Sequence, residues 1–404
     1  MNRRGVVNLG VCFFTVLTAF AIRYNYSVLL PEMLPSLGIS KTEAGIIFSS
    51  YFIAYTVFSP IAGLLADKID IRIILSLFLC LLSLGTFLIA GASSLVKISF
   101  FFMIAGIGCS ACWSPVVALA QRWVSDRYRG TALAFIDTGA SLGGVIISLT
   151  MPLVVASFSW RMGWRLLGIL AFLVAFFAFF LVRKSPDSNP VFPYEKCSAS
   201  ARYPVKVMYK EVLKGFKFWL IGLSYFFIGF SVLIPFTFIS TYAVKELTLS
   251  YEVATKLITM IAIAAMAGKI IFGVISDALG RVKVLIFCCA LITICSFGMA
   301  YEREFFKLSL LTIIFGFSRG AIFPLYAACA SDYFPKDFVG TIVGLWTLFL
   351  GIGAILAPVI AGWTADITGS FAWSFILAMA TAMLSLFLLL PVERASISTD
   401  LLKD

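Results

Sequence analysis

The sequence predicts an all-α polytopic membrane protein with twelve transmembrane helices in two six-helix, pseudo-symmetric halves. Three observations support this fold class: the composition, a succession of long apolar runs, and an internal repeat. The 404 residues are 61% hydrophobic and 13% charged, whereas a soluble domain is about half apolar and about a quarter charged. A soluble core cannot hide so much apolar surface, so we expect lipid to surround it.

Apolar runs long enough to cross a bilayer as helices follow one another along the chain. They cover residues 8–31, 42–66, 72–93, 98–121, 130–156, 164–182, 217–243, 252–276, 282–300, 307–330, 339–364 and 372–391. The linker 183–216, rich in Pro, Ser and Lys, separates six runs from six. We therefore predict an N-terminal bundle over 1–182 and a C-terminal bundle over 217–404. We expect the first run, which resembles a secretory signal, to remain in place as a span.

The two halves repeat. Four pairs of residues share one separation of 210 positions: Gly63 with Gly273, Asp67 with Asp277, Gly106 with Gly316, and Gly130 with Gly340. A constant offset argues for duplication of a six-helix unit. Because each unit has an even number of spans, the repeat is expected to be parallel, with its axis along the membrane normal.

The basic residues give an orientation. The net charge is +11, and 20 of the 31 Lys and Arg residues fall in segments that are cytoplasmic if the N-terminus is inside, against eight in the outer segments. Basic loops beside apolar runs orient a membrane protein rather than bind nucleic acid. We predict that both termini and the linker 183–216 face the cytoplasm and that the protein resides in the cell (inner) membrane. We expect no nucleic-acid partner.

Four charged residues fall deep inside predicted spans: Arg23, Lys269, Arg319 and Asp137. A charge at mid-bilayer costs about 2.5–3.5 kcal/mol on insertion scales, so each needs a reason. Three cations against one acid favour an anionic substrate, with Arg23 from one half and Arg319 from the other. Lys269 is expected either to add a third contact to the substrate or to pair with Asp137 in a salt bridge.

Further candidates line the predicted substrate path between the halves. They are Asn25, Tyr26, Tyr55, Trp113, Tyr225 and Trp346. The alternative for the aromatic residues is plain packing between helices, which is the commoner use of aromatics in such a chain. The Cys109-x-x-Cys112 pair lies inside a predicted span, where helix packing is a better explanation than redox chemistry or metal binding.

Two related loops end the second and eighth runs. Residues 63–75 read GLLADKIDIRIIL and residues 273–285 read GVISDALGRVKVL. Both resemble the G-x-L-A-D-R-x-G-R-K-x-x-L signature of the major facilitator superfamily, in the expected places of a 6+6 chain. A carboxylate at the end of one span can hold the positive N-terminal end of another helix. We therefore predict gates at Asp67 and Asp277, steadied by Arg72 and Arg281.

The expected partners of these gates follow from the repeat. Asp67 should meet the start of the eleventh run near Gly340 and Thr341, and Asp277 the start of the fifth near Gly130 and Thr131. The alternative is a pair of plain turns between helices. The presence of both copies favours the gates.

The first span carries a finer resemblance. Residues 23–31, RYNYSVLLP, are similar to the D-R-x-N-x-S-x-A-x-P pattern of the anion:cation symporter branch of that superfamily, whose members carry organic anions. Ile22 stands where the branch has an aspartate, and Cys109 where it has a glutamate. Proton coupling is therefore assigned to the remaining deep carboxylate, Asp137. The region 217–285 resembles the oxalate/formate and monocarboxylate carriers, which have a cation where Lys269 stands.

Other classes of function fit the sequence less well. The chain has no histidine, shows no catalytic constellation and has no Walker A sequence, so neither an enzyme nor an ATP-driven pump is indicated. A channel would show a repeated filter segment. We expect a monomeric secondary carrier of a small organic anion that works by alternating access, with protons as a possible coupled ion and without cofactor or metal. A carrier of a neutral solute or drug remains the alternative.

Overall fold

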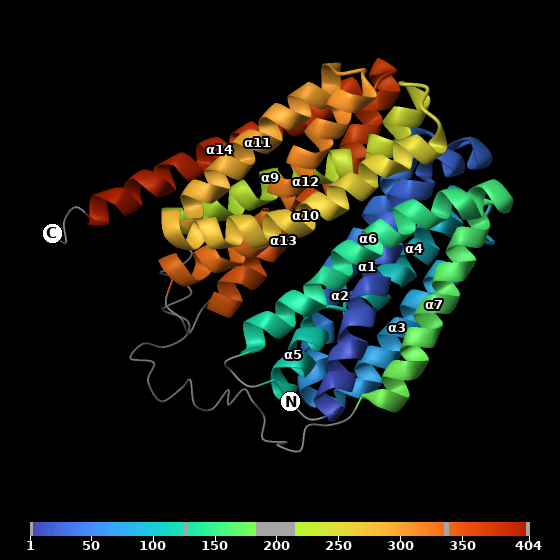
Figure 1. The fold of residues 1–404 in the computed structure, drawn as a ribbon, viewed down its shortest axis with the longest axis horizontal. Coiled ribbons are helices and arrows are strands. Elements are labelled where there is room, and N and C mark those ends of the chain that lie inside the picture. The colour runs from blue at the N-terminus through green and yellow to red at the C-terminus, as the bar shows by residue number, and fades with distance from the viewer. Residues whose placement is uncertain (1–2, 125–127, 183–214, 335–338, 401–404) are drawn as a thin grey trace. The chain divides into compact units, whose positions relative to one another are not determined.

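The computed structural model describes residues 3–124, 128–182, 215–334 and 339–400. The described residues form helices and connecting turns, without strands (Figure 1). The first-half helices are α1 (Arg3–Leu37), α2 (Lys41–Lys68), α3 (Ile71–Ile89), α4 (Leu95–Cys109), α5 (Ser114–Trp123), α6 (Arg129–Ser157) and α7 (Trp160–Leu181). The second-half helices are α9 (Phe216–Lys245), α10 (Tyr251–Leu279), α11 (Arg281–Tyr301), α12 (Phe305–Tyr333), α13 (Val339–Thr368) and α14 (Ala372–Asp400).

The prediction of twelve spans is confirmed within these residues. Twelve helical stretches are long and apolar enough to cross a bilayer, and their centres match the predicted runs. Lipid-facing positions explain the many exposed Leu, Ile, Val and Phe side chains, such as Leu153, Phe172 and Ile270. The linker 183–214 lies outside the described residues, so its predicted cytoplasmic location stays a prediction.

The fourth span differs from the continuous helix expected over 98–121. It breaks between α4 and α5, where residues 110–113 form a turn. Pro115 in the first turn of α5 accounts for the break, because proline lacks the N–H of the helical ladder and its ring clashes with the carbonyl four residues earlier. The turn satisfies part of its own backbone, since the Cys112 amide donates to the Cys109 carbonyl at 2.9 Å.

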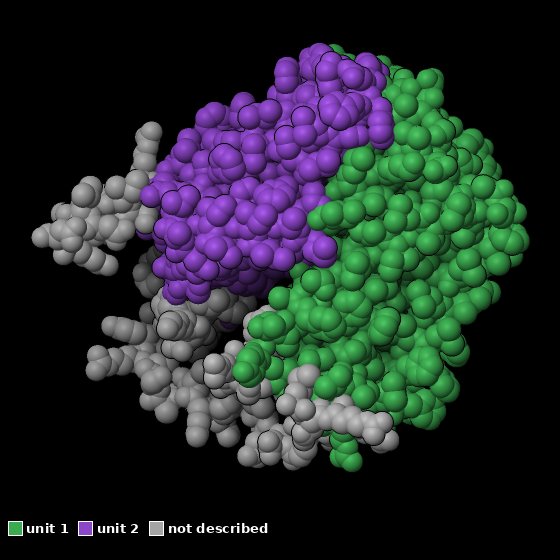
Figure 2. Space-filling model, in the orientation of Figure 1, with its two compact units in different colours: residues 1–188, 236–263, 355–374 green, residues 189–235, 264–354, 375–404 purple. Residues whose placement is uncertain are grey.

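The described chain divides into two compact units, coloured separately in Figure 2. The first contains residues 1–188, 236–263 and 355–374, and the second contains residues 189–235, 264–354 and 375–404. Helices α9, α10 and α13, and the first residues of α14, therefore divide between the two units. The predicted bundles 1–182 and 217–404 are based on the sequence repeat, and this division stays a prediction.

Glycines bring helices into close contact within each unit. In the first unit, a Cβ at Gly106 of α4 would collide with the Tyr51 carbonyl of α2, and one at Gly108 with Leu82 of α3. In the second unit, a Cβ at Gly268 of α10 would collide with the Phe317 carbonyl of α12. The absence of a side chain at these positions is what allows the backbones to approach, as in other membrane helix pairs.

Candidate functional site

Arg23 of α1 lies in an aromatic enclosure inside the first unit. Its guanidinium carbon is 4.7 Å from the Phe20 ring centroid and 5.1–5.5 Å from the ring centroids of Tyr51, Phe52 and Tyr55 on α2. Ring faces attract a cation, by about 0.5–2 kcal/mol for each good contact. The enclosure therefore lowers the cost of holding this charge at membrane depth.

The rings do not satisfy the hydrogen-bonding capacity of Arg23. A guanidinium has five N–H donors, and the hydrogen bond that Arg23 makes is a weak one from Nη2 to the Cys109 sulfur at 3.8 Å. Its Nε is buried without an acceptor, while the Tyr51 and Tyr55 hydroxyls lie near enough to interact with the guanidinium. Within the described residues, no carboxylate forms an ion pair with Arg23. The site thus offers a cation and several unused donors.

Two features of α4 position Cys109 beside Arg23. Gly106, one turn before Cys109, allows α4 to lie directly on the Tyr51 backbone. The helix then ends at Cys109, so the turn 110–113 begins next to the guanidinium. Non-helical backbone at membrane depth is tolerated where it is buried in protein or lines a cavity, and broken helices mark binding sites in several transporter folds. Trp113, one of the predicted lining residues, lies in this turn, whereas the break itself differs from the continuous span expected from the sequence.

The other predicted lining residues differ in whether their polar atoms already form hydrogen bonds within the protein. Asn25 is fully buried, and neither atom of its amide makes a hydrogen bond. Tyr26 stacks on Phe48 and donates its hydroxyl to the Ala44 carbonyl at 2.5 Å. Trp346 donates to the Phe218 carbonyl at 3.0 Å. Asn25 therefore has unused polar atoms, whereas Tyr26 and Trp346 have their polar atoms engaged inside their own unit.

In the second unit, the glycine contacts bring Lys269 and Arg319 to one helix crossing. Gly268 meets Phe317, and a Cβ at Gly320 would collide with the Ala265 carbonyl. Lys269 and Arg319 are each the direct neighbour of one of these glycines, on α10 and α12 respectively, and both are half-buried. Tyr225 of α9 belongs to the same unit and stacks on Tyr326 of α12 at 4.2 Å. The structure thus places two of the three predicted deep cations at one level of one unit.

Asp137 lies half-buried on α6 in the first unit. Because Lys269 belongs to the second unit, the predicted salt bridge between them stays a prediction. The same holds for a substrate that bridges Arg23 and Arg319, and for the pairing of Asp277 with the region of Thr131.

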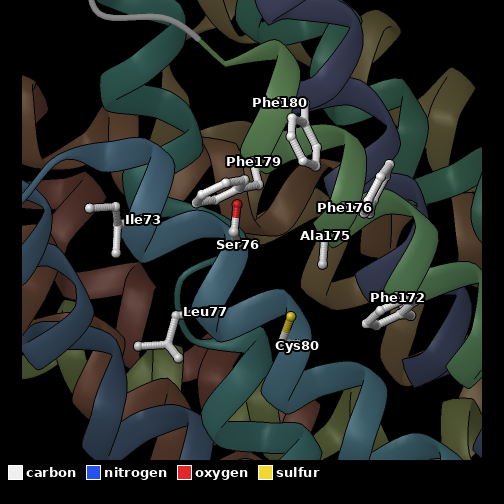
Figure 3. A pocket seen from close by; sticks show the side chains of 9 residues that line it. All are labelled: Ile73, Ser76, Leu77, Cys80, Phe172, Ala175, Phe176, Phe179 and Phe180. Atoms are coloured by element: carbon white, nitrogen blue, oxygen red, sulfur yellow. The ribbon is translucent and has the colours of Figure 1, made fainter.

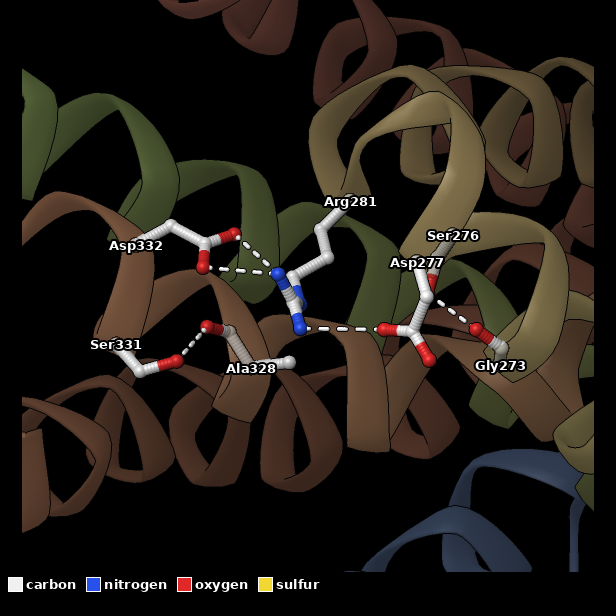
Figure 4. A network of polar contacts seen from close by, with 7 residues as sticks. All are labelled: Gly273, Ser276, Asp277, Arg281, Ala328, Ser331 and Asp332. Atoms are coloured by element: carbon white, nitrogen blue, oxygen red, sulfur yellow. Dashed lines mark hydrogen bonds and ion pairs between the residues drawn. The ribbon is translucent and has the colours of Figure 1, made fainter.

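The second loop signature forms a charged network at the end of the second unit (Figure 4). Arg281 donates from Nη2 to Asp277 at 3.2 Å and from Nη1 to both carboxylate oxygens of Asp332 at 2.9 and 3.1 Å. Arg281 thus links the ends of α10, α11 and α12. The contact with Asp277 agrees with the predicted role of Arg281, whereas Asp332 gives no sequence signal, because it lies 51 residues from its partner and carries no motif.

The first loop signature is described only in part. The side chain of Asp67 lies outside the described residues, so its predicted gate stays a prediction. Arg72 lies over the Phe179 ring at 5.1 Å, and its backbone amide donates to the Asp70 carboxylate at 3.0 Å. Asp70, at the position of the signature's glycine, therefore caps the start of α3.

A separate cavity of about 300 Å³ lies between α3 and α7 (Figure 3). Four phenylalanines of α7 form one wall, and Ile73, Leu77 and Cys80 of α3 form the other. No charged side chain lines it, and the phenylalanines are largely exposed on a surface that lipid would cover. Its chemistry suits hydrocarbon rather than an ion, so it is not the candidate substrate site.

Comparison with known proteins decides the family. The family model of the Major Facilitator Superfamily matches residues 12–342 and 257–403. The chain belongs to the major facilitator superfamily. As a member of this superfamily, it is a membrane transporter and not an enzyme, in agreement with the resemblance carried by the two loop signatures.

Individual superfamily members resemble the chain over most of its length. The hexuronate transporter of Bacillus subtilis is 24% identical, over 89% of this chain and 88% of its own. The hexose-6-phosphate:phosphate antiporter of Salmonella typhimurium is 26% identical, over 89% and 83%. A crystal structure of a bacterial homologue of the human lysosomal transporter Spinster superposes with a TM-score of 0.76 at 14% identity, over 98% of both chains. That structure supports the major facilitator fold.

Proposed function

We propose that this major facilitator carries a small organic anion, most simply a carboxylate, by alternating access. The observation that carries the proposal is Arg23, a membrane-embedded guanidinium whose charge is stabilised by aromatic rings but whose donors lack strong acceptors. The names of the relatives agree in charge, since a hexuronate and a hexose 6-phosphate are both anions.

Among the described residues, Arg23 has no carboxylate partner for its guanidinium, and its Nε has no acceptor. A carboxylate or phosphate accepts two parallel hydrogen bonds from a guanidinium and neutralises it in a low-dielectric setting. A cationic drug would add a second positive charge to the same site. A neutral solute could use some donors but would leave the charge uncompensated, which makes it the weaker candidate.

Lys269 and Arg319 support the proposal from the second unit, where they share one helix crossing. An anion that is bound by Arg23 would bind the closed conformation more tightly if Lys269 and Arg319 also contact it there. Such differential affinity is what lets a ligand move a conformational equilibrium. Asp137 is our candidate for proton coupling, because it is the deep carboxylate that the sequence offers.

The test is binding and uptake in proteoliposomes with galacturonate, glucose 6-phosphate and uncharged glucose. Charge-assisted hydrogen bonds contribute about 1.5–3 kcal/mol, so Arg23→Lys should weaken anion binding about tenfold or more, because lysine lacks the planar fork. Arg319→Ala and Lys269→Ala should weaken it as well. Thermal-shift titrations report binding independently of transport.

Arg161 provides a matched control for Arg23. It is also half-buried, but its Nη1 donates to the Ala90 and Ala92 carbonyls at 3.1 and 2.9 Å. Arg161→Lys should lower stability without changing anion affinity. If anion transport survives Arg23→Ala and Arg319→Ala at wild-type affinity, the anion-site proposal fails and a neutral-solute carrier becomes the better account.

A further inference from the structure

The C-terminal end of α13 caps the N-terminal end of α2 within the first unit. Ser40 and Glu43 form a capping box that uses their own two amides. The amides between them, of Lys41 and Thr42, donate to the Asp366 carboxylate at 3.1 and 2.8 Å, and the Thr42 hydroxyl donates to it at 2.6 Å. A residue 324 positions away thus satisfies the donors that the capping box leaves open.

The contact is reciprocal. Lys41 Nζ donates to the Ala365 carbonyl at 3.2 Å and to the Gly369 carbonyl at 3.5 Å, at the end of α13. It also lies 4.5 Å from the Phe371 ring centroid. The carboxylate therefore sits at the positive end of one helix and the ammonium at the negative end of the other, which is the favourable sense for both helix dipoles.

Close backbone packing extends this contact along both helices. A Cβ at Gly362 would collide with the Lys41 carbonyl, and one at Gly45 with the Pro358 carbonyl. Further along, the Ser49 hydroxyl donates to the Ile355 carbonyl at 2.5 Å. Both glycines are needed for this close approach, because a side chain at either position would push α2 and α13 apart.

The same end of the first unit holds two other second-half helices. Glu246 of α9 accepts hydrogen bonds from the Ser370 hydroxyl at 2.5 Å and the Phe371 amide at 2.6 Å. Tyr251 of α10 donates to the Val28 carbonyl of α1 at 3.0 Å, and Ser240 of α9 donates to the Ser27 carbonyl. These contacts lie toward the C-terminal end of α1, away from the chain's N-terminus.

We propose that Asp366 and Lys41 form a latch that closes the membrane side opposite the N-terminus and that opens once in each transport cycle. The inference rests on alternating access in this superfamily and not on the identity of the substrate. Asp366 is exposed and Lys41 half-buried. The two side chains do not pair with each other but form hydrogen bonds to the opposite helix end. Because solvent screens charge interactions at exposed positions, this set of contacts is specific in geometry yet weak enough to release.

A reporter cysteine at Ser240 tests the latch. Ser240 is buried against the α1 backbone, so the labelling rate of Ser240→Cys by a membrane-impermeant maleimide measures opening of this side. The reagent is added to the membrane face opposite the one on which an N-terminal tag is accessible. Asp366→Asn and Asp366→Ala should raise the labelling rate about tenfold, as expected for loss of charge-assisted hydrogen bonds. The same protein without the reporter gives the background.

Two further variants separate the latch from general destabilisation. Gly362→Ala keeps every charged group but forces α13 away from the Lys41 carbonyl, so it should also raise the labelling rate. Glu43→Gln removes a carboxylate at the same helix end that touches α2 alone and should leave the rate within twofold of the parent. Equal labelling in the Asp366, Gly362 and Glu43 variants would overturn the latch. Because anion affinity is not the readout, this outcome is distinguishable from failure of the proposed substrate.

Discussion

At the residue scale, two arginines of the first unit differ in how far their hydrogen-bond donors are satisfied. Arg161 lies over the Trp160 ring at 4.4 Å and donates to two backbone carbonyls at the end of α3. Arg23 lies among rings as well, but its hydrogen-bond partner is a sulfur. Both side chains are half-buried, so burial alone does not separate them. The unused donors of Arg23 do.

Asp277 permits a prediction at this scale. Its ion pair with Arg281 is largely exposed, so Asp277→Asn should lower the free energy of unfolding by less than about 1 kcal/mol. If Asp277 is a gate, the same change should slow turnover several-fold while leaving substrate affinity unchanged. Single-turnover exchange and equilibrium binding measure the two effects separately.

Lys283→Gln is the matched control, because it breaks another ion pair of the second unit, between the exposed Lys283 and the half-buried Glu393 at 3.6 Å, that belongs to no predicted gate. Weakened binding by Asp277→Asn with normal turnover would contradict the gate.

The sequence allowed prediction of individual charges and of the local contact between Arg281 and Asp277, but not of partners that lie far away along the chain. Arg23 and Asp277 stood out because a charge inside a span or in a repeated signature is unusual in itself. Asp332 and Asp366 did not, since each lies near a span end where charges are common. Their partners are 51 and more than 320 residues away, and no local spacing rule connects such positions.

At the element scale, close contacts between glycines and neighbouring backbones bring α10 and α12 together at the level of Lys269 and Arg319. Gly268→Ala should separate α10 from α12, because its Cβ would collide with the Phe317 carbonyl. Overpacking of this kind costs about 1–3 kcal/mol. We expect a lower apparent melting temperature and, because Lys269 is the adjacent residue, weaker substrate binding.

Gly344→Ala is the control for that change. Gly344 lies in α13, and a Cβ there meets no atom within 4 Å. Alanine should be neutral or slightly stabilising at such a helical position. Equal melting temperatures and affinities for both alanine variants would show that the α10–α12 contact does not depend on Gly268.

Hydropathy predicted the existence of each span, because helix length and apolar composition are set by the bilayer. It did not predict the break between α4 and α5, because the turn residues Ser110, Ala111, Cys112 and Trp113 carry no charge and do not interrupt the apolar run. The local signal was Ser114-Pro115, which the structure shows at the start of α5. The helix contacts at Gly106 and Gly268 were likewise invisible, since composition does not tell which face meets which neighbour.

At the scale of the whole molecule, an even number of spans places both termini on one side of the membrane. The distribution of Lys and Arg predicts that this side is the cytoplasm. Reporter fusions in the linker near Ser198 and after the last span should both give cytoplasmic signals, and a fusion in the turn before α2, near Gly38, should give an external one. An external signal near Ser198 would overturn the predicted topology.

Two of the helices that divide between the compact units contain a proline close to the boundary. The unit boundary in α9 falls directly after Pro235, and that in α13 falls within one turn of Pro358. Proline removes one rung of the helical ladder and is a common site of helix bending. Each of these two helices therefore lacks one backbone hydrogen bond close to the boundary between the units. If α9 and α13 bend at these prolines, single helices supply part of the change between conformations that a rigid-body movement would otherwise provide.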